Sequence, residues 1–403
     1  MGSFAYRAID PSGRPVAGIE AAESSRELLE RLHVRGVLVT DVREVGGAGA
    51  LARWQEALRG PSNRDLALLF RQLATLLQSG MPLAQALAVL EARFPQPRLR
   101  AVIAQVRIDV EEGHALSAAL ARHPRYFSAL VAPTVQAGEA AGALDVILPR
   151  LAAHFEKEHG LRQKLRSAAI YPAIVGAVSV AAITFLMTYV VPTLVGIFEG
   201  LQATLPWQTR LLIAVADGIR DYWPVLLAAI IVVAGALVVI RRRPWGSAVA
   251  DRLALSLPAV GRFNQQVITS RFCRTLATLL ASGIPLLRAL DIVANTVGNR
   301  IVREQVLEVQ EGVRTGGRLG RLLTRQPVFP PLVGEMVTVG EEAGTVDAML
   351  DRAADFQDVE VDYALQALTT ALEPTLILAM GVIVGFVVVS MYLPLFDLVK
   401  VVR

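Results

Sequence analysis

Three long stretches without a charged residue constrain this chain more than any other feature of its sequence. They cover residues 167–198, 222–240 and 374–396, and none contains Asp, Glu, Lys or Arg. A helix needs about 20 predominantly apolar residues to cross the hydrocarbon core of a bilayer. Helices buried in soluble proteins rarely extend this far without a charge. The sequence therefore predicts three transmembrane helices, joined by more polar segments that make up the rest of the 403 residues.

Basic residues beside the first two apolar stretches predict their orientation, because the cytoplasmic flanks of transmembrane helices are rich in Lys and Arg. The basic residues before the first stretch and after the second are Lys157, Arg162, Lys164, Arg166, Arg241, Arg242 and Arg243. The connection at 199–221 contains only two arginines. We therefore expect this connection to be periplasmic and both polar halves of the chain to be cytoplasmic.

The orientation of the third stretch and of the two termini follows from the same topology. Lys400 and Arg403 follow the third stretch, and taken alone they favour a cytoplasmic C-terminus. The second polar half must, however, lie on the same side as the basic flank at 241–243, so we expect 374–396 to lead outward. The first residues contain no apolar run typical of a cleaved signal peptide. We therefore expect a cytoplasmic N-terminus and a periplasmic C-terminus.

The two polar halves are copies of one another. The phrase "LATLLQSGMPL" begins at Leu73 and "LATLLASGIPL" begins at Leu276, with nine of eleven positions identical. Further along, "GEAAGALD" begins at Gly138 and "GEEAGTVD" begins at Gly340. Similar spacing relates the prolines near the start of the first and third apolar stretches. Each copy is therefore a cytoplasmic segment of about 100 residues followed by a transmembrane helix. The second transmembrane helix has no counterpart in this duplication.

Each copy reads as a compact helical bundle. In the first copy, leucines recur at spacings of three and four, which is typical of an amphipathic helix: Leu66, Leu69, Leu73, Leu76 and Leu77. A glycine favours a left-handed helix end and a proline can open the next helix, so Gly80 and Pro82 predict a sharp helical hairpin. Gly283 and Pro285 repeat this arrangement in the second copy.

The combined patterns predict a mainly α membrane protein, with two duplicated cytoplasmic helical bundles, three transmembrane helices and a small N-terminal α+β unit. Hydrophobic residues make up 53% of the chain and charged residues 19%, which suits a chain that is partly soluble and partly embedded. The expected segments are the α+β unit (1–45), a linker (46–63), the first bundle (64–166), the first transmembrane helix (167–198), a periplasmic connection (199–221), the second transmembrane helix (222–240), the second bundle (241–373), the third transmembrane helix (374–396) and a short periplasmic tail (397–403).

The sequence contains no pattern typical of an enzyme active site. It has no Gly-Lys-Ser/Thr phosphate loop, no His-Glu-x-x-His zinc pair and no Gly-x-Ser-x-Gly nucleophile turn. Its one cysteine excludes an intrachain disulfide, and no dense basic run points to nucleic acid. A small-solute transporter is a remote alternative, because its helices would carry ionisable groups and these three carry none. We therefore expect a scaffold rather than an enzyme.

The paired "LATLL–SG–PL" and "GE–AG–D" phrases, with the N-terminal "FAYRAIDPSGRPVAGIEAAESSRELLERLHVRGVLVTDV", resemble the type II secretion system F family over essentially the whole chain. The resemblance implies a platform protein in the bacterial inner membrane. It also implies contact with a cytoplasmic hexameric ATPase, other inner-membrane platform subunits and pseudopilins, together with self-association. The alternative within the family is the platform of a type IV pilus, which assembles pilins.

The acidic residues of the repeated phrases are the candidate contact residues, because their repetition has no purely apolar explanation. They are Glu139, Asp145, Glu341, Glu342 and Asp347. They lie on matching turns of the two copies and are predicted to meet partner proteins or neighbouring bundles. Helix capping is the alternative explanation for the two aspartates, which fit a first helical turn and favour its dipole.

The resemblance also implies a calcium site in the first bundle. Its matching positions in this sequence are Glu139, in the "GE–AG" phrase, and Gln85, just after the hairpin. Calcium prefers six to eight oxygen ligands, several of them carboxylates, and Gln85 offers only a carbonyl. The alternative is that Glu139 forms hydrogen bonds at a helix end. In the second copy Arg288 takes the place of Gln85, which argues against a cation there.

Overall fold

The computed structural model divides the chain into two compact units, Met1–Ser62 and Asn63–Arg403. The residues that the structure describes are 2–9, 15–22, 25–34, 38–45, 61–193, 206–242, 251–252 and 258–401. Most of the predicted linker at 46–63 and the first part of the predicted connection at 199–221 therefore lie outside the described residues.

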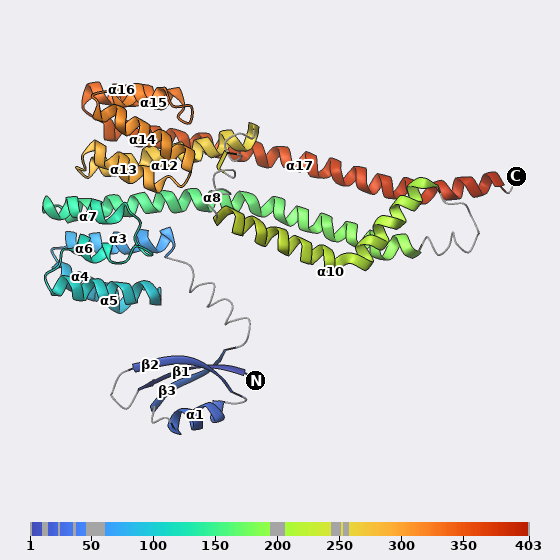
Figure 1. Ribbon diagram of the computed structural model, residues 1–403, viewed down its shortest axis with the longest axis horizontal. Helices are drawn as coiled ribbons and strands as arrows, with labels where there is room; N and C mark the ends of the chain where they lie inside the picture. The colour runs from blue at the N-terminus through green and yellow to red at the C-terminus, as the bar shows by residue number, and fades with distance from the viewer. Residues whose placement is uncertain are drawn as a thin grey trace. The chain divides into compact units, whose positions relative to one another are not determined.

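The described part of the first unit is a three-stranded antiparallel sheet with one helix (Figure 1). Its elements are β1 (Gly2–Ile9), β2 (Pro15–Ala22), α1 (Ser25–Val34) and β3 (Leu38–Val45). β1 is the central strand and pairs with both others. Leu28 and Leu32 lie four residues apart on α1 and are fully buried, because residues at this spacing share one helix face. This apolar face covers the sheet.

The first bundle consists of five helices and the start of a sixth. They are α3 (Asn63–Gln78), α4 (Leu83–Arg93), α5 (Pro97–Glu111), α6 (Leu116–Ala121), α7 (Val131–Ala140) and α8 (Leu144–Phe185). The leucine stripe of α3 faces the interior, where Phe70 stacks on Phe155 of α8 with ring centroids 5.7 Å apart. α3 and the beginning of α8 therefore form the central pair of the bundle.

The second bundle repeats this order. Its helices are α12 (Pro258–Ala281), α13 (Leu286–Thr296), α14 (Arg300–Arg314), α15 (Leu319–Thr324), α16 (Pro331–Ala343) and α17 (Val346–Val401). The helical hairpin is present in both bundles: Gly80 has a φ of 85° and Gly283 a φ of 82°, which glycine adopts without steric cost. Pro82 and Pro285 then precede α4 and α13.

α8 and α17 run side by side from the two bundles, and both continue into the apolar stretches without a break at the bundle boundary (Figure 1). Among the described residues, the stretches Leu144–Thr193 and Val346–Ser390 are helices long and apolar enough to cross a membrane. The remaining predicted stretch, 222–240, lies within α10 (Trp207–Arg242). Pro224 lies inside α10, and Figure 1 shows this helix bent, as an internal proline favours.

The start of α10 occupies part of the predicted connection, since residues 207–221 are helical. Leu212 and Ala216 lie one turn apart and are buried against Met187 and Val387. Met187 belongs to a π-helical turn, η1 (Leu186–Val190), that follows α8. The apolar face of this segment is short and its flanks are charged, so a search for long uncharged stretches misses it.

Candidate functional site

Glu139 caps a helix in the first bundle. It lies at the end of α7, and its carboxylate accepts hydrogen bonds from the first two backbone N–H groups of α6, at Leu116 (2.5 Å) and Ser117 (3.2 Å). The Ser117 hydroxyl donates a further bond to it at 2.5 Å. The first N–H groups of a helix have no partner within the helix, so the carboxylate satisfies them and favours the positive end of the helix dipole.

Glu341 does the same in the second bundle. Its carboxylate accepts from the backbone N–H groups of Leu319 (2.6 Å) and Gly320 (3.0 Å) at the start of α15. The neighbouring Glu342 is exposed and forms a 3.4 Å ion pair with Arg318. The repetition of "GE" is thus accounted for by repeated capping of a six-residue helix, while the contact role of these glutamates stays a prediction.

We expect Glu139→Gln and Glu341→Gln each to lower the free energy of unfolding by about 1–2 kcal/mol, because an amide replaces a charged acceptor at the helix start. The measurement is denaturant or thermal unfolding of the purified protein in detergent. Glu342→Gln is the matched control, since its ion pair is exposed and exposed pairs contribute about 0–1 kcal/mol. Equal effects of all three variants would contradict the capping role.

The two predicted aspartates occupy the first turns of the long helices. Asp145 is exposed on α8, and its backbone carbonyl accepts a hydrogen bond from the Gln78 side-chain amide at 3.0 Å. Asp347 occupies the matching turn of α17 and lines a cleft between the bundles. Both positions suit a negative charge near a helix N-terminus.

The two predicted calcium ligands lie in different surroundings. Gln85 is exposed on α4, whereas the Glu139 carboxylate is bonded to the start of α6. Among the described residues, one group of acidic and histidine side chains comes close enough to hold a metal ion: Asp109, Glu112 and His114. It contains neither predicted ligand, and Arg122 already pairs with Asp109. Calcium at Glu139 and Gln85 stays a prediction.

The densest charge cluster of the described residues lies where the two bundles meet, along α8, α12 and α17. Arg274 of α12 is buried, with only 6% of its side chain exposed. Its guanidinium contacts three aspartates of α17, at 3.2 Å from Asp351, 3.1 Å from Asp355 and 2.5 Å from Asp358. These aspartates share one face of α17 because they lie four and three residues apart.

Lys157 of α8 joins this cluster from the first bundle. Its ammonium lies 2.9 Å from Asp355 and 3.5 Å from Asp351. Partial burial of Asp355 opposes its charge, but hydrogen bonds from Lys157 and Arg274 outweigh this effect, so the pKa of Asp355 lies below its usual value. Two basic groups from different bundles therefore share the same aspartates, and the cluster connects the bundles.

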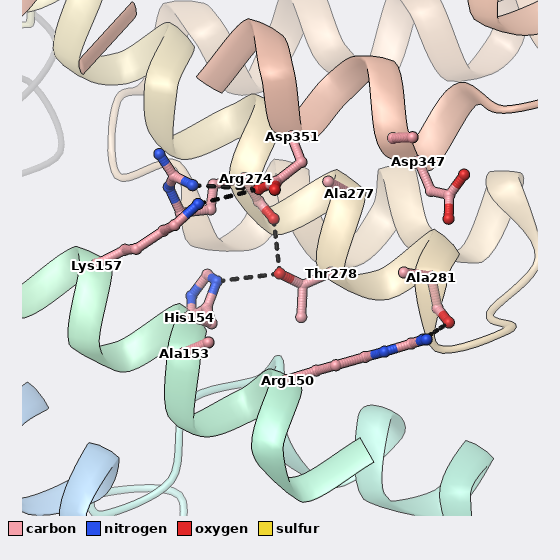
Figure 2. Close-up of a pocket in the computed structure, with 11 residues that line it drawn as sticks. Arg150, Ala153, His154, Lys157, Arg274, Ala277, Thr278, Ala281, Asp347 and Asp351 are labelled. Atoms are coloured by element: carbon pink, nitrogen blue, oxygen red, sulfur yellow. Dashed lines mark hydrogen bonds and ion pairs between the residues drawn. The ribbon is translucent and has the colours of Figure 1, made fainter. Parts of the chain in front are cut away.

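A cleft of about 280 Å³ lies beside this cluster (Figure 2). Arg150 of α8 donates a hydrogen bond across it to the backbone carbonyl of Ala281, the last residue of α12. His154 of α8 and Thr278 of α12 are 3.3 Å apart. Because the Thr278 hydroxyl donates to a backbone carbonyl of its own helix, the Nδ1–H of His154 is the donor in this pair. Burial, with the nearby Arg274 charge, lowers the pKa of His154 to about 4.

We therefore expect the protein to lose stability as the pH falls from 6.5 towards 4. In this range the unfolded chain binds a proton at His154, whose usual pKa is 6.5, while the folded chain does not. Asp355, whose pKa lies below its usual value of 3.8, adds to the same loss only as the pH approaches 4. The measurement is the melting temperature in detergent between pH 7 and pH 4.5. His154→Phe, which places the residue of the second copy there, should flatten the dependence, and an unchanged slope would contradict this assignment.

Polar contacts continue along α8 and α17 towards the apolar stretches. Lys164 pairs with Asp362 at 2.6 Å, and the Tyr171 hydroxyl donates to Glu373 at 3.4 Å. Together with Lys157, these α8 residues repeat every seven residues, the spacing at which two parallel helices meet along one seam. We call this row of contacts between α8 and α17 the interbundle seam.

The interbundle seam was not among the sequence predictions. Its signal was nevertheless present, since Lys157 and Lys164 are two of the three lysines in the chain and lie seven residues apart. The aspartates Asp351, Asp355 and Asp362 occur in the second copy alone, where the first copy has uncharged residues. A difference between the copies, rather than their repetition, marks this contact surface.

Comparison with known proteins matches both copies and the N-terminal unit to models of one family. The family model described as "Type II secretion system (T2SS), protein F" matches residues 69–192 and 272–394, once in each copy. The model of the N-terminal domain of the same family matches residues 1–43.

Relatives from both secretion and pilus systems align over nearly the full chain. The "Type IV pilus assembly protein PilC" of Thermus thermophilus is 44% identical over 406 residues, covering 99% of this chain and 98% of that protein. The "Type II secretion system protein F" of Pseudomonas aeruginosa is 37% identical over 406 residues and covers 99% of both. That of Vibrio cholerae is 34% identical over 400 residues, covering 99% and 98%. With the family model matched in both copies, these identities show that this chain belongs to the type II secretion system protein F family.

Proposed function

We propose that this chain is the inner-membrane platform protein of a type II secretion system, which couples a cytoplasmic assembly ATPase to the assembly of a pseudopilin filament. Support comes from the names of the protein F relatives. The observation that carries the proposal is the interbundle seam, which joins two bundles directly to helices that enter the apolar stretches. Such a scaffold transmits motion and has no need of its own phosphate loop.

The proposed topology has three membrane crossings, with the N-terminus and both bundles in the cytoplasm and the C-terminus in the periplasm. Two of these crossings are α8 with η1 and α17, and the third is the apolar part of α10. The basic residues 241–243, at and just beyond its C-terminal end, support a cytoplasmic location for that end. The partners that we propose are a hexameric ATPase, other inner-membrane subunits, pseudopilins and further copies of the same chain.

A type IV pilus platform is the second candidate. It is favoured by the identity of 44% to a protein named for type IV pilus assembly, which exceeds that to the two protein F relatives. The transporter alternative finds no support in the first apolar stretch. Within this stretch, the hydroxyls of Thr184, Thr188 and Thr193 donate hydrogen bonds to carbonyls of their own helix.

The experiment that tests the proposal is mass spectrometry of proteins that co-purify with the tagged chain from gently solubilised native membranes, with the untagged chain as control. Recovery of one assembly ATPase with pseudopilins would support the secretion platform. Recovery of a major pilin with a second, retraction-type ATPase would instead favour the pilus platform. Recovery of neither an ATPase nor a pilin-like subunit would overturn the platform function.

A further inference from the structure

The two bundles contact each other through different faces, although they are copies. The first bundle contributes one face of α8, where His154 and Lys157 point towards the second bundle (Figure 2). The second bundle receives them on α12 and α17, at Thr278 and Asp355. We call the first of these surfaces the docking face and the second the receiving face.

Each copy contains both faces, because equivalent positions can be assigned residue by residue. They lie 203 residues apart in α3 and α12, and 202 residues apart in α8 and α17. A repeated ion pair supports the assignment: Arg71 contacts Glu156 at 2.6 Å in the first bundle, and Arg274 contacts Asp358 at 2.5 Å in the second. The same backbone geometry therefore exists in both bundles.

In the described part of the chain, the docking face of the second bundle is exposed. Its residues at the positions of His154, Lys157 and Leu161 are Phe356, Val359 and Tyr363, which are 44%, 47% and 63% exposed. A two-fold contact uses the same patch on both partners and would have covered them. The contact between the bundles is therefore heterologous, and it leaves one docking face and one receiving face unused.

The unused receiving face lies on the first bundle. Its residues, at the positions of Thr278, Ala281, Asp355 and Asp362, are Thr75, Gln78, Ala153 and Gly160. The two residues from α3 are exposed and the two from α8 are half-buried, and Ala153 also lines the open cleft beside α12, so this face borders the contact between the bundles without being closed by it.

The two unused faces complement each other as the two used faces do. Within the chain, Lys157 meets Asp355, so a positive charge faces a negative one. At the equivalent unused positions, Val359 would meet Ala153, so an apolar residue faces an apolar one. Neither of the two unused positions carries a charge, whereas both of the used positions do. This pattern is expected if the two unused faces contact each other.

The next pair along the seam follows the same rule. Lys164 meets Asp362 within the chain, whereas the equivalent unused positions hold the uncharged Gln366 and Gly160. In both pairs, the two used positions are charged and the two equivalent unused positions are uncharged. Contact between the unused faces would therefore leave no lysine or aspartate of these pairs facing an uncharged residue.

The contact between an arginine and the C-terminus of a helix also has an equivalent at the unused faces. Arg150 donates to the last carbonyl of α12, at Ala281. Its equivalent, Arg352, is exposed on α17, and the equivalent carbonyl is that of Gln78 at the C-terminus of α3. A cation is favoured at a helix C-terminus in either bundle.

Membrane lipid does not explain the exposed apolar residues of the second docking face. Phe356, Val359 and Tyr363 alternate along α17 with acidic residues at positions 355, 358, 360 and 362. Four carboxylates within one short segment are too costly to place in hydrocarbon. The apolar residues therefore face an aqueous environment, where contiguous exposed apolar surface marks a protein contact.

We propose that the docking face of the second bundle binds the receiving face on the first bundle of another copy of this chain. Copies then associate head to tail, with Phe356, Val359 and Tyr363 packed against α3 and α8 of the neighbour. A heterologous contact of this kind forms a ring if its rotation closes. The inference rests on the self-association included in the proposed function, but not on the identity of the machine.

The test is cross-linking between single-cysteine substitutions in full-length chains within native membranes. Val359→Cys is made in a copy with one tag and Ala153→Cys in a copy with a second tag, and both are co-expressed. The native Cys273 does not interfere, because it is fully buried and burial raises its pKa to about 12. A short bis-maleimide is then expected to produce a two-chain species carrying both tags.

Each substitution expressed alone is expected to give no two-chain species, because a heterologous contact does not bring identical positions together. The matched control is Lys157→Cys with Asp355→Cys in one chain, which the same reagent should close within that chain. A two-chain species from Val359→Cys alone would overturn the head-to-tail contact.

Absence of any two-chain species, with the intrachain control closing normally, would overturn it too, as would capture of Val359→Cys by another protein. This measurement requires no secretion and no filament. A negative result therefore leaves the platform function standing, whereas failed co-purification of an ATPase or pilin would not affect the cross-link.

Discussion

Replacing Arg274 by methionine is expected to lower the free energy of unfolding by about 2–3 kcal/mol. Removing one partner of a buried ion pair leaves the other charges uncompensated, which typically costs about 3–5 kcal/mol. The value here lies lower because the side chains of Asp351 and Asp355 remain 52% and 58% exposed and Lys157 still contacts them. Unfolding of the purified protein by denaturant in detergent measures the difference.

The matched control is Arg71→Met, which removes the equivalent ion pair of the first bundle. Both partners of that pair are 47% exposed, so the loss should stay within about 1 kcal/mol. If both variants lose the same stability, burial of Arg274 is not the cause. The two copies thus provide an internal comparison in which one arginine is buried against aspartates of α17 and its equivalent is about half exposed.

Replacing Gly320 by alanine is expected to cost about 3 kcal/mol, at the upper end for overpacking a well-packed core. Gly320 is where α15 crosses α16. A Cβ atom at this position would lie 2.5 Å from the backbone nitrogen of Thr338 and 2.6 Å from the carbonyl oxygen of Gly334. Backbone atoms cannot rotate away as a side chain can, so the two helices must separate. The melting temperature should fall accordingly.

The first bundle again supplies the control. Its residue at the position of Gly320 is Ser117, and the residue at the position of Gly334 is Ala132, so both already carry a Cβ atom. Ser117→Ala should cost only about 1.5 kcal/mol, for the lost hydrogen bond to Glu139. A loss from Gly320→Ala no larger than this would show that α15 and α16 can move apart freely.

The long helices of this protein could be predicted from sequence because they depend on features that repeat or extend along the chain. Uncharged stretches and leucine spacing specify helices whatever surrounds them, and α8 and α17 are accordingly long and apolar. The contact role of Glu139 and Glu341 stays a prediction, while the hydrogen bonds of Glu139 match the alternative of a residue bonded at a helix end. Only the fold brings α6 beside the end of α7, so no local pattern distinguishes the two roles.

The interbundle seam could not be derived in the same way. Lys157 and Asp355 are separated by 198 residues, and their contact depends on how the two bundles pack. Periodicity specifies which face of a helix is buried, but not which other helix covers it. The start of α10 was missed for a related reason, since Leu212 and Ala216 become a buried face only when α17 and η1 lie beside them.

The unbroken length of α17 has a mechanical consequence. This helix has 56 residues, so at 1.5 Å per residue it is a rod of about 84 Å that begins beside the cleft and ends beyond the third apolar stretch. Pro374 and Pro394 lie inside α17 and each removes one backbone hydrogen bond, yet the helix continues through both, so a displacement of the second bundle is carried along one continuous element. α8 differs, because the π-helical turn at Leu186–Val190 interrupts its regular ladder. α17 therefore continues as one α-helix from the second bundle through its apolar stretch, whereas α8 changes to a π-helical turn before its apolar stretch ends.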